Sequence, residues 1–200
     1  KKRNILDERN YLFLYFVEAV KSLQPKYILI ENVTGLKSFN GGTFADDIEN
    51  SLEEIGYDTS HQVLNAADFG VPQIRRRVVF LGANRSHSKI EKIDPEFGTQ
   101  YKSYRTVRDA IYDLPRIKSG GIAYSYSSDF STLNEYQRLM RGECKKLLNH
   151  VAPNHPQEVI EKIESTEPGE PLYPKYRQRI RLSWDSPSPT QVSGGIRPQF

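Results

Sequence analysis

A short apolar segment that ends on two polar residues constrains the fold of this 200-residue chain more than any other feature. The run is Tyr27-Ile28-Leu29-Ile30, and Glu31-Asn32 follows it directly. Continuous apolar runs of this length are typical of parallel strands that are covered on both faces. In open α/β sheets, the carboxyl ends of such strands form the edge where ligands bind. The segment therefore predicts a buried parallel strand that ends at Glu31-Asn32, with Glu31 at a ligand-binding edge.

A helix is expected immediately before this strand. Residues 8–23 carry apolar side chains at the three-four spacing that places them on one helical face. These side chains are Leu12, Phe16, Ala19, Val20 and Leu23. Pro25 follows, and proline cannot continue a helix. The pattern predicts an amphipathic helix that packs through this face.

Further helix and strand patterns follow the run. A second helix is expected over residues 44–55, with Thr43 as its N-cap and Gly56 as its C-terminal stop. Strands are expected near residues 58–64 and 77–83. Because helix and strand alternate through residue 84, this part of the chain is predicted to form an α/β layer.

The sequence after Asn84 becomes irregular. Short helices are expected over residues 107–114 and 157–165, and a third after Thr132, where Thr132-Leu133-Asn134-Glu135 fits a capping box. The connections between them are rich in Gly, Ser and Pro, which is loop chemistry. A compact α/β part followed by an irregular part is therefore predicted.

Basic and aromatic side chains concentrate in the irregular part. Residues 85–182 carry seventeen Lys and Arg against thirteen Asp and Glu, together with eight of the twelve tyrosines. Residues 1–84 carry ten basic against eleven acidic side chains. Basic side chains interleaved with aromatic rings are typical of nucleic-acid surfaces. A solvated, slightly basic and loop-rich domain is the alternative interpretation.

Cysteine usage and hydropathy exclude several classes of protein. The single cysteine, Cys144, rules out an internal disulfide and a multi-cysteine metal site, and it suits a reducing compartment. No run is long enough to cross a bilayer, and no apolar signal segment follows Lys1. His150 and His155 lack partners at metal-ligand spacing. We therefore expect a cytoplasmic protein with no membrane segment and no metal.

Glu31 is the first candidate for chemistry. A carboxylate at the end of an apolar strand is partly desolvated, so it could be kept protonated or poised for proton transfer. The alternative is a structural carboxylate that caps a helix or pairs with a basic side chain. Position alone does not decide between the two.

The segment Gln73-Ile74-Arg75-Arg76-Arg77 is the second candidate. If the extended conformation begins at Gln73, then Gln73, Arg75 and Arg77 share one face. Such a face is a donor array suited to a phosphate, a base carbonyl or a carboxylate. The arginines repel one another unless an anion compensates them, which favours a functional site over a merely solvated strand end.

In this order, the two motifs resemble the DNA (cytosine-5) methyltransferases. Residues 27–36 resemble the family's Glu-Asn-Val segment and residues 68–77 its Gln-x-Arg-x-Arg segment. Residues 6–13 are similar to the helix after the catalytic loop, and residues 181–190 to the ninth motif. The resemblance therefore spans almost the whole chain, and the combination of segments is highly specific.

The resemblance implies a fold and a division of the chain. It implies part of a Rossmann-like S-adenosylmethionine-dependent methyltransferase sheet followed by a small irregular target-recognition domain. Residues 1–84 would belong to the catalytic domain, residues 85–180 would read double-stranded DNA, and residues 181–200 would return to the catalytic domain. The protein would be DNA-associated, of the bacterial restriction-modification type.

The resemblance also implies residue roles. Glu31 would hydrogen-bond N3 and the exocyclic amine of a cytosine flipped out of the duplex, and Arg77 would bind its O2. Arg75 would fix the loop and a neighbouring phosphate, while Gln73 would brace the strand. Thr190 would contact the DNA backbone beside the flipped nucleotide, and Leu12 would line the pocket of S-adenosylmethionine.

Three parts of the family pattern do not occur in these 200 residues: the Pro-Cys nucleophile segment, the glycine-rich cofactor motif and the last motif. Cys144 lies in the variable region with no proline before it, so it is expected to be an ordinary surface or half-buried thiol. The expectation is an internal fragment that is inactive alone and needs the rest of the catalytic domain. The alternatives are a non-catalytic DNA-binding subunit of a split enzyme, or a metal-dependent nuclease that uses Glu31 with Asp58 and Asp68.

Overall fold

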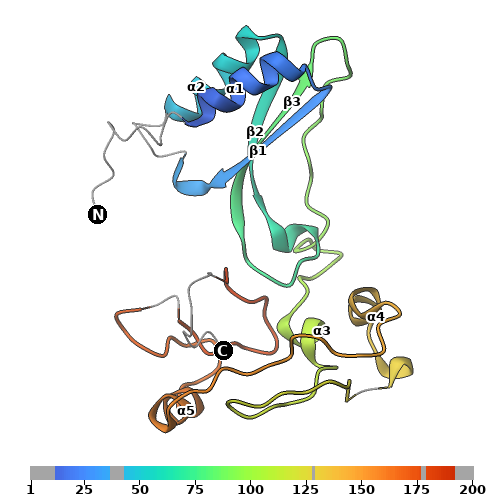
Figure 1. The fold of residues 1–200 in the computed structure, drawn as a ribbon, viewed down its shortest axis with the longest axis vertical. Helices are drawn as coiled ribbons and strands as arrows, with labels where there is room; N and C mark the ends of the chain where they lie inside the picture. The colour runs from blue at the N-terminus through green and yellow to red at the C-terminus, as the bar shows by residue number, and fades with distance from the viewer. Residues whose placement is uncertain (1–11, 37–42, 128, 177–178, 192–200) are drawn as a thin grey trace. The chain divides into compact units, whose positions relative to one another are not determined.

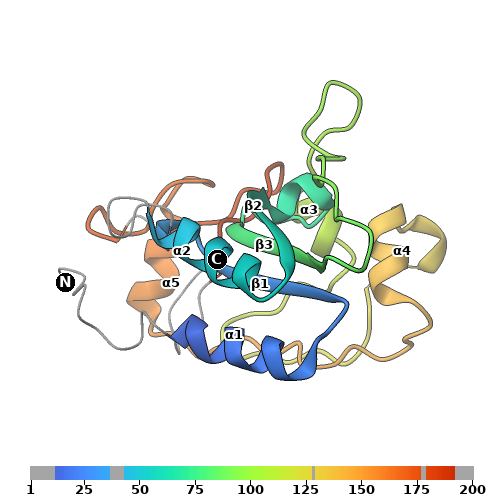
Figure 2. The same cartoon turned by 90° about the horizontal axis from the view of Figure 1, so that it is seen from above.

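The computed structural model describes residues 12–36, 43–127, 129–176 and 179–191. The chain packs as two units (Figures 1 and 2). Unit 1 contains the residues up to Asn65 together with Arg76–Asp94, and unit 2 contains Ala66–Arg75 and the residues from Pro95 on. This is a division by packing. The roles assigned to residues 1–84, 85–180 and 181–200 remain predictions.

A three-stranded sheet is the centre of unit 1. Its strands are β1 (Tyr27–Val33), β2 (Tyr57–Asn65) and β3 (Arg76–Asn84), in the order β1-β3-β2. Both outer strands pair antiparallel with β3, and they therefore run in the same direction as each other. Helix α2 (Thr43–Glu54) lies between β1 and β2 in the chain.

The predicted parallel pairing of residues 27–30 was wrong among the described strands. Leu29 lies opposite Leu81 in an antiparallel ladder. Among the described residues, only one face of β1 is covered: Ile28 is buried, whereas Leu29, on the other face, is 60 % exposed. The strand also continues through Val33, so Glu31 lies within it and not after its end. A continuous apolar run indicates a strand, but it does not specify the direction of the neighbouring strand.

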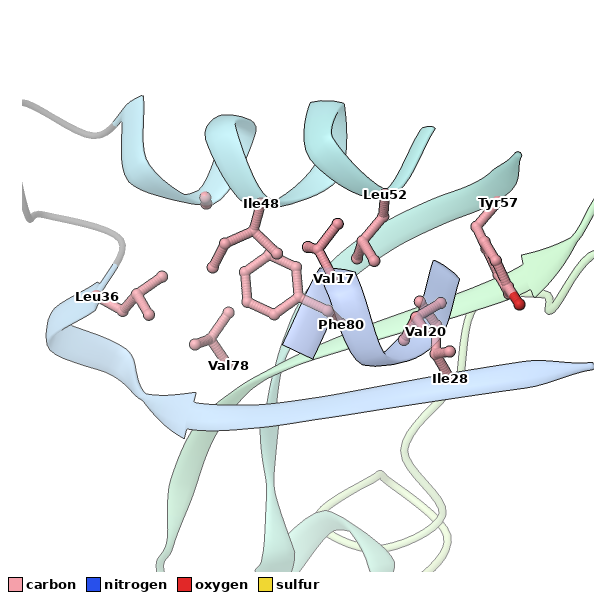
Figure 3. Packing of buried hydrophobic residues seen from close by; sticks show 10 residues of the cluster. Val17, Val20, Ile28, Leu36, Ile48, Leu52, Tyr57, Val78 and Phe80 are labelled. Carbon is pink, nitrogen blue, oxygen red and sulfur yellow. The ribbon is translucent and has the colours of Figure 1, made fainter. Parts of the chain in front are cut away.

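Two helices cover one face of this sheet, α1 (Leu12–Leu23) and α2 (Figure 1). Side chains alternate along a strand, so Ile28, Phe80 and Tyr57 point to the helices while Glu31 and Arg77 lie on the opposite face. In Figure 3, the Phe80 ring lies between β3 and the α2 side chains. The ten fully packed members of the core are Val17, Val20, Ile28, Leu36, Ala45, Ile48, Leu52, Tyr57, Val78 and Phe80.

The buried face of α1 agrees with the predicted one at Phe16 and Val20 only. Val17 and Val20 are buried, and Phe13 and Phe16 pack against the core. Leu12, Ala19 and Leu23 of the predicted face are exposed. Because apolar residues occur around most of this helix, spacing alone does not select the side that meets the sheet.

The C-terminal end of α2 matches the prediction, whereas its N-terminal end does not. Gly56 has a φ of +94°, which favours glycine, and its N–H donates to the Glu53 carbonyl at 3.0 Å. Thr43 is already the first helical residue, so it is not the N-cap. Beyond Gly56, the Tyr57 hydroxyl donates to the Pro25 carbonyl at 2.6 Å and ties β2 to the α1–β1 connection.

Unit 2 is built from short helices joined by irregular segments. They are α3 (Val107–Ile111), α4 (Glu135–Arg141), α5 (Gln157–Glu164) and the 3-10 turns Ala66–Phe69 and Phe130–Thr132. The helices predicted over residues 107–114 and 157–165 are confirmed, the first of them shorter than predicted. Among the described residues, no helix is long and apolar enough to span a membrane.

The predicted capping box was placed two residues too early. Asn134 is the N-cap of α4, and it exchanges hydrogen bonds with Gln137. Thr132 instead ends the preceding 3-10 turn, where its hydroxyl donates to the Asp129 carbonyl at 2.8 Å. Thr132 and Asn134 both carry capping side chains, and the sequence motif alone does not say which one begins the helix.

Candidate active site

An ion pair between Glu31 and Arg77 occupies the sheet face that α1 and α2 leave uncovered. Arg77 lies opposite Val33 in the ladder, so Glu31 is its diagonal neighbour on the same face. The Arg77 Nε lies 2.8 Å from the Glu31 Oε1. The Arg77 side chain is 20 % exposed and that of Glu31 is 46 % exposed. Residues 46 positions apart in the sequence are thus brought into direct contact at a solvent-accessible position.

The Arg77 guanidinium is held by a second contact. Its Nη1 donates to the carbonyl of Arg76 at 2.8 Å. A planar guanidinium held at two of its nitrogens has a defined orientation. For Arg77, the compensating anion is therefore the carboxylate of Glu31, and Arg77 is in turn the basic partner of Glu31.

This arrangement can bind the edge of a heterocycle that carries an acceptor and a donor. A carboxylate oxygen accepts hydrogen bonds from an amino group, and a guanidinium donates to a carbonyl oxygen. The neighbouring Leu29, Val79 and Leu81 on this face are apolar, so they offer a surface against which a flat ring can pack. The pair therefore suits a planar polar ligand.

The Gln-x-Arg-x-Arg segment is divided between the two units. The β3 ladder begins at Arg76, whereas Gln73 forms a bridge with Ser188 in unit 2. The strand therefore does not begin at Gln73, which was the condition for Gln73, Arg75 and Arg77 to share one face of it. Arg75 accepts a hydrogen bond at its carbonyl from the Ala66 N–H at 3.0 Å.

Thr190 is bound directly to this segment. Its hydroxyl donates to the Ile74 carbonyl at 2.8 Å. The Ile74 N–H donates to the Ser188 carbonyl at 2.8 Å, and the Ser188 N–H donates to the Pro72 carbonyl at 2.9 Å. The two predicted motifs around residues 73 and 190, distant in the sequence, are thus hydrogen-bonded within unit 2.

Helix α3 holds the other side of the segment that carries Thr190, and sequence reasoning missed this contact. The N–H groups of Val107 and Arg108 donate to the carbonyls of Ser186 and Trp184, at 2.9 and 2.8 Å. The Arg108 Nε donates to Asp185 Oδ1 at 2.8 Å. This hydrogen bond lowers the pKa of Asp185 and raises the pKa of Arg108. The only sequence signal was the helix predicted near residue 107.

The other predicted site residues lie elsewhere. Leu12 begins α1 with an exposed side chain, and Cys144 is an exposed free thiol. His150 contacts the Pro115 carbonyl through Nε2 at 2.8 Å. No group of three or more His, Cys, Asp or Glu within the described ranges could hold a metal ion.

The carboxylates of the nuclease alternative have other partners. Asp58 pairs with Arg85 at 3.1 Å, and Asp68 accepts a hydrogen bond from the Tyr104 hydroxyl at 2.9 Å. Asp58 lies in unit 1 and Asp68 in unit 2. A metal-dependent nuclease therefore receives no support from these residues.

Comparisons with known proteins identify the family of this chain. The sequence profile of the C-5 cytosine-specific DNA methylase family matches residues 1–195. The chain therefore belongs to this family, whose members are DNA (cytosine-5) methyltransferases.

Particular bacterial relatives are similar over most of the chain. The Type II methyltransferase M1.HphI of Haemophilus parahaemolyticus is 34 % identical over 97 % of this chain and 47 % of its own length. The Type II methylase M.HgiDII of Herpetosiphon aurantiacus is 32 % identical over 90 % of this chain and 48 % of its own length. The chain thus spans about half the length of these relatives.

A solved structure supports the fold. A crystal structure of a prophage-encoded candidate DNA modification methyltransferase (E. coli) matches with a TM-score of 0.66 and 24 % identity. The match covers 92 % of this chain and 57 % of that chain. At this identity, the likeness shows that the fold is shared.

Proposed function

We propose that this chain carries the base-binding and DNA-contacting parts of an enzyme that methylates C5 of cytosine in duplex DNA. The observation that carries the proposal is the contact of Glu31 with Arg77 at 2.8 Å on the uncovered sheet face. Cytosine offers an amino group next to N3 and a carbonyl O2 on one edge. Glu31 would accept a hydrogen bond from the amine with one oxygen and share a proton with N3 through the other, while Arg77 would donate to O2.

The cytosine must leave the duplex to reach these groups. Its edge and ring face are covered by pairing and stacking in duplex DNA, so an enzyme that acts on C5 flips the nucleotide out. On binding, the base edge would replace part of the contact between Glu31 and Arg77. During attack at C6, Arg77 would then stabilise the negative charge that develops on O2, and the proton shared between Glu31 and N3 would neutralise the charge on the ring nitrogen.

Three residues of the neighbouring segments would position the DNA. Arg75 would hold its loop and contact a phosphate near the flipped nucleotide. Thr190 would lie beside the DNA backbone, and its hydrogen bond to the Ile74 carbonyl supports a fixed position relative to that loop. Gln73 would brace the segment, in agreement with its bridge to Ser188.

The methyl donor of this family is S-adenosylmethionine, which supplies an activated methyl group when it is bound. The described residues fit it at one place. Leu12 exposes an apolar side chain at the start of α1, which suits packing against the cofactor. We propose no other residue of this chain as a contact to it.

The nucleophilic thiol would come from outside these 200 residues. Cys144 is the only cysteine in the sequence, and it is exposed in unit 2, beyond the end of α4. The chain would therefore act together with the remainder of a catalytic domain, in one polypeptide or as a subunit of a split enzyme. In the complete enzyme, these strands would be part of a larger, Rossmann-like sheet; β1 and β2 are the two edges of the described sheet.

Residues 85–180 would contact and read the DNA. Arginines there lie over aromatic rings, with Arg105 4.6 Å from the Tyr136 ring centroid and Arg141 3.9 Å from that of Tyr126. Such stacked pairs present cationic groups in fixed places. Under this proposal, the protein works in the compartment that holds the bacterial DNA.

Glu31→Gln tests the proposal in the complete reading frame that contains the chain. We expect transfer of tritiated methyl groups to duplex DNA to fall by at least a hundredfold, because the amide cannot share a proton with N3 as the ring becomes negatively charged. Glu49→Gln is the matched control, since Glu49 contacts His61 at 2.9 Å in the same unit. Equal rates for the wild type and Glu31→Gln would refute the proposed role.

A further inference from the structure

Two segments of unit 2 form a short antiparallel ribbon, residues 120–124 and 147–153. Ile122 and Val151 form its central bridge. The Ala152 N–H donates to the Gly121 carbonyl at 2.9 Å, and the Ala123 N–H donates to the His150 carbonyl at 3.1 Å. At one end of the ribbon, the Leu147 N–H donates to the Tyr124 carbonyl at 3.0 Å.

The ribbon exposes large apolar side chains. Ile122 is 51 % and Val151 57 % exposed, and they lie on the same face because they are directly opposite each other. Tyr124 is 70 % and Leu148 74 % exposed. Leu147, by contrast, is buried and anchors the ribbon in unit 2. Several exposed apolar side chains on one short element indicate a contact surface.

Basic side chains flank this surface. Residues 138–150 contain Arg138, Arg141, Lys145 and Lys146 against the single carboxylate Glu143. This excess of three equals the formal net charge of the whole chain. Lys145 and Lys146 directly precede Leu147 in the ribbon.

The cluster around Arg141 lies next to the other strand of the ribbon. Arg141 is positioned 3.9 Å from the centroid of the Tyr126 ring, two residues beyond Tyr124. Basic residues therefore adjoin both segments at the end of the ribbon where the Leu147 N–H donates to the Tyr124 carbonyl. Lys145 and Lys146 precede Leu147, and Arg141 contacts Tyr126. An apolar ridge with cations beside it complements a polyanion that carries apolar groups between its charges.

DNA has this character in its major groove. The groove admits a two-stranded ribbon, and its base edges present hydrogen-bond donors and acceptors and one apolar group, the C5-methyl of thymine. Aliphatic side chains form no hydrogen bonds, so the methyl group is the base feature that they can recognise. Phosphates line both sides of the groove and attract the flanking cations.

We propose that this ribbon enters the major groove of the substrate DNA, where Ile122 and Val151 contact thymine methyl groups and Lys145 and Lys146 contact flanking phosphates. The inference rests on the proposed function, because it requires that the protein bind duplex DNA. It adds the residues that read the sequence and the base that they select.

The test replaces thymine by uracil, which removes only the methyl group. The complete reading frame first selects its preferred site from a pool of random duplexes. We expect thymine in that site, and we expect uracil substitution to weaken binding about fourfold for each contacted methyl, the value of one buried methyl group. Ile122→Ala and Val151→Ala are expected to bind both duplexes with similar affinity. Leu23→Ala, at an exposed leucine of unit 1, is the control and keeps the discrimination.

The lysines are tested through the salt dependence of binding. Lys145→Ala with Lys146→Ala is expected to reduce the slope of log affinity against log salt concentration by about 1.8, for two phosphates lost. Lys21→Ala in α1, which lies in unit 1 and outside residues 85–180, is expected to leave the slope unchanged.

The outcomes separate the two proposals. No binding to any duplex would overturn the proposed function itself. Duplex binding combined with a preferred site that lacks thymine, or with discrimination that survives Ile122→Ala and Val151→Ala, would leave that function standing and overturn the role of the ribbon. Each variant replaces an exposed side chain, and thermal unfolding checks that it folds as the wild type does.

Discussion

Replacing Arg77 separates its contribution to folding from its contribution to catalysis. The Glu31 partner is nearly half exposed, and such ion pairs contribute about 0.2–1 kcal/mol to the free energy of unfolding. Arg77→Ala also removes a stem that is mostly covered, which adds about 1 kcal/mol. Arg77→Lys keeps the charge and most of the stem, and we expect it to unfold almost as the wild type does.

The expected effect on turnover is larger for both variants. A preorganised donor at a site of developing charge contributes about a hundredfold to a thousandfold in kcat. A lysine cannot reproduce the planar fork that reaches the carboxylate and the base carbonyl together. We therefore expect Arg77→Lys to lose at least a hundredfold in kcat with little change in DNA affinity or stability.

Single-turnover methyl transfer and urea unfolding measure the two quantities on the same preparations. Arg85→Ala is the matched control, because Arg85 forms a comparable ion pair with Asp58 in the same unit. It should retain near-normal turnover. The reasoning fails if Arg77→Lys is as active as the wild type, or if Arg85→Ala loses as much activity as Arg77→Ala.

Three further predictions follow from the packing and the site. Phe80→Ala removes a fully buried ring from the core of unit 1 and is expected to lower the free energy of unfolding by about 3–5 kcal/mol, as measured by urea denaturation; a loss below 1 kcal/mol would contradict the packing. Thr190→Val removes the donor to the Ile74 carbonyl, and we expect weaker DNA binding in anisotropy titrations with a stability loss of about 1 kcal/mol; unchanged affinity would argue against a positioning role. The purified 200-residue chain is expected to incorporate no tritiated methyl into duplex DNA, and detectable incorporation would show that it holds its own nucleophile.

The sequence predicts the elements of unit 1 better than their arrangement. Local patterns located α1, α2 and the three strands, because apolar periodicity and turn residues are local properties. They did not indicate that residues 27–33 pair antiparallel with β3, since the direction of a neighbouring strand depends on chain connections. They also placed the buried face of α1 only in part: Phe16 and Val20 pack on the core as predicted, whereas Leu12, Ala19 and Leu23 are exposed.

The sequence identified the residues of the candidate site, but it did not predict which of them contact each other. Glu31 and the arginines each indicated a partner of opposite charge, and the antiparallel register makes Glu31 and Arg77 that pair. The contact between Arg108 and Asp185 joins residues 77 positions apart, and no local pattern links them. Contacts of this kind form only when the chain packs in three dimensions, and local sequence patterns do not reveal them.

The most direct test of the central claim measures the contact between Glu31 and the amino group of the target cytosine. Wild type and Glu31→Gln each act on a duplex with cytosine and on one with 2-pyrimidinone, which lacks that amine, at the target position. The account predicts that removing the amine slows methyl transfer by the wild type far more than by Glu31→Gln, so that the two changes are strongly non-additive. Losses that simply multiply would contradict the claim that Glu31 binds the flipped base.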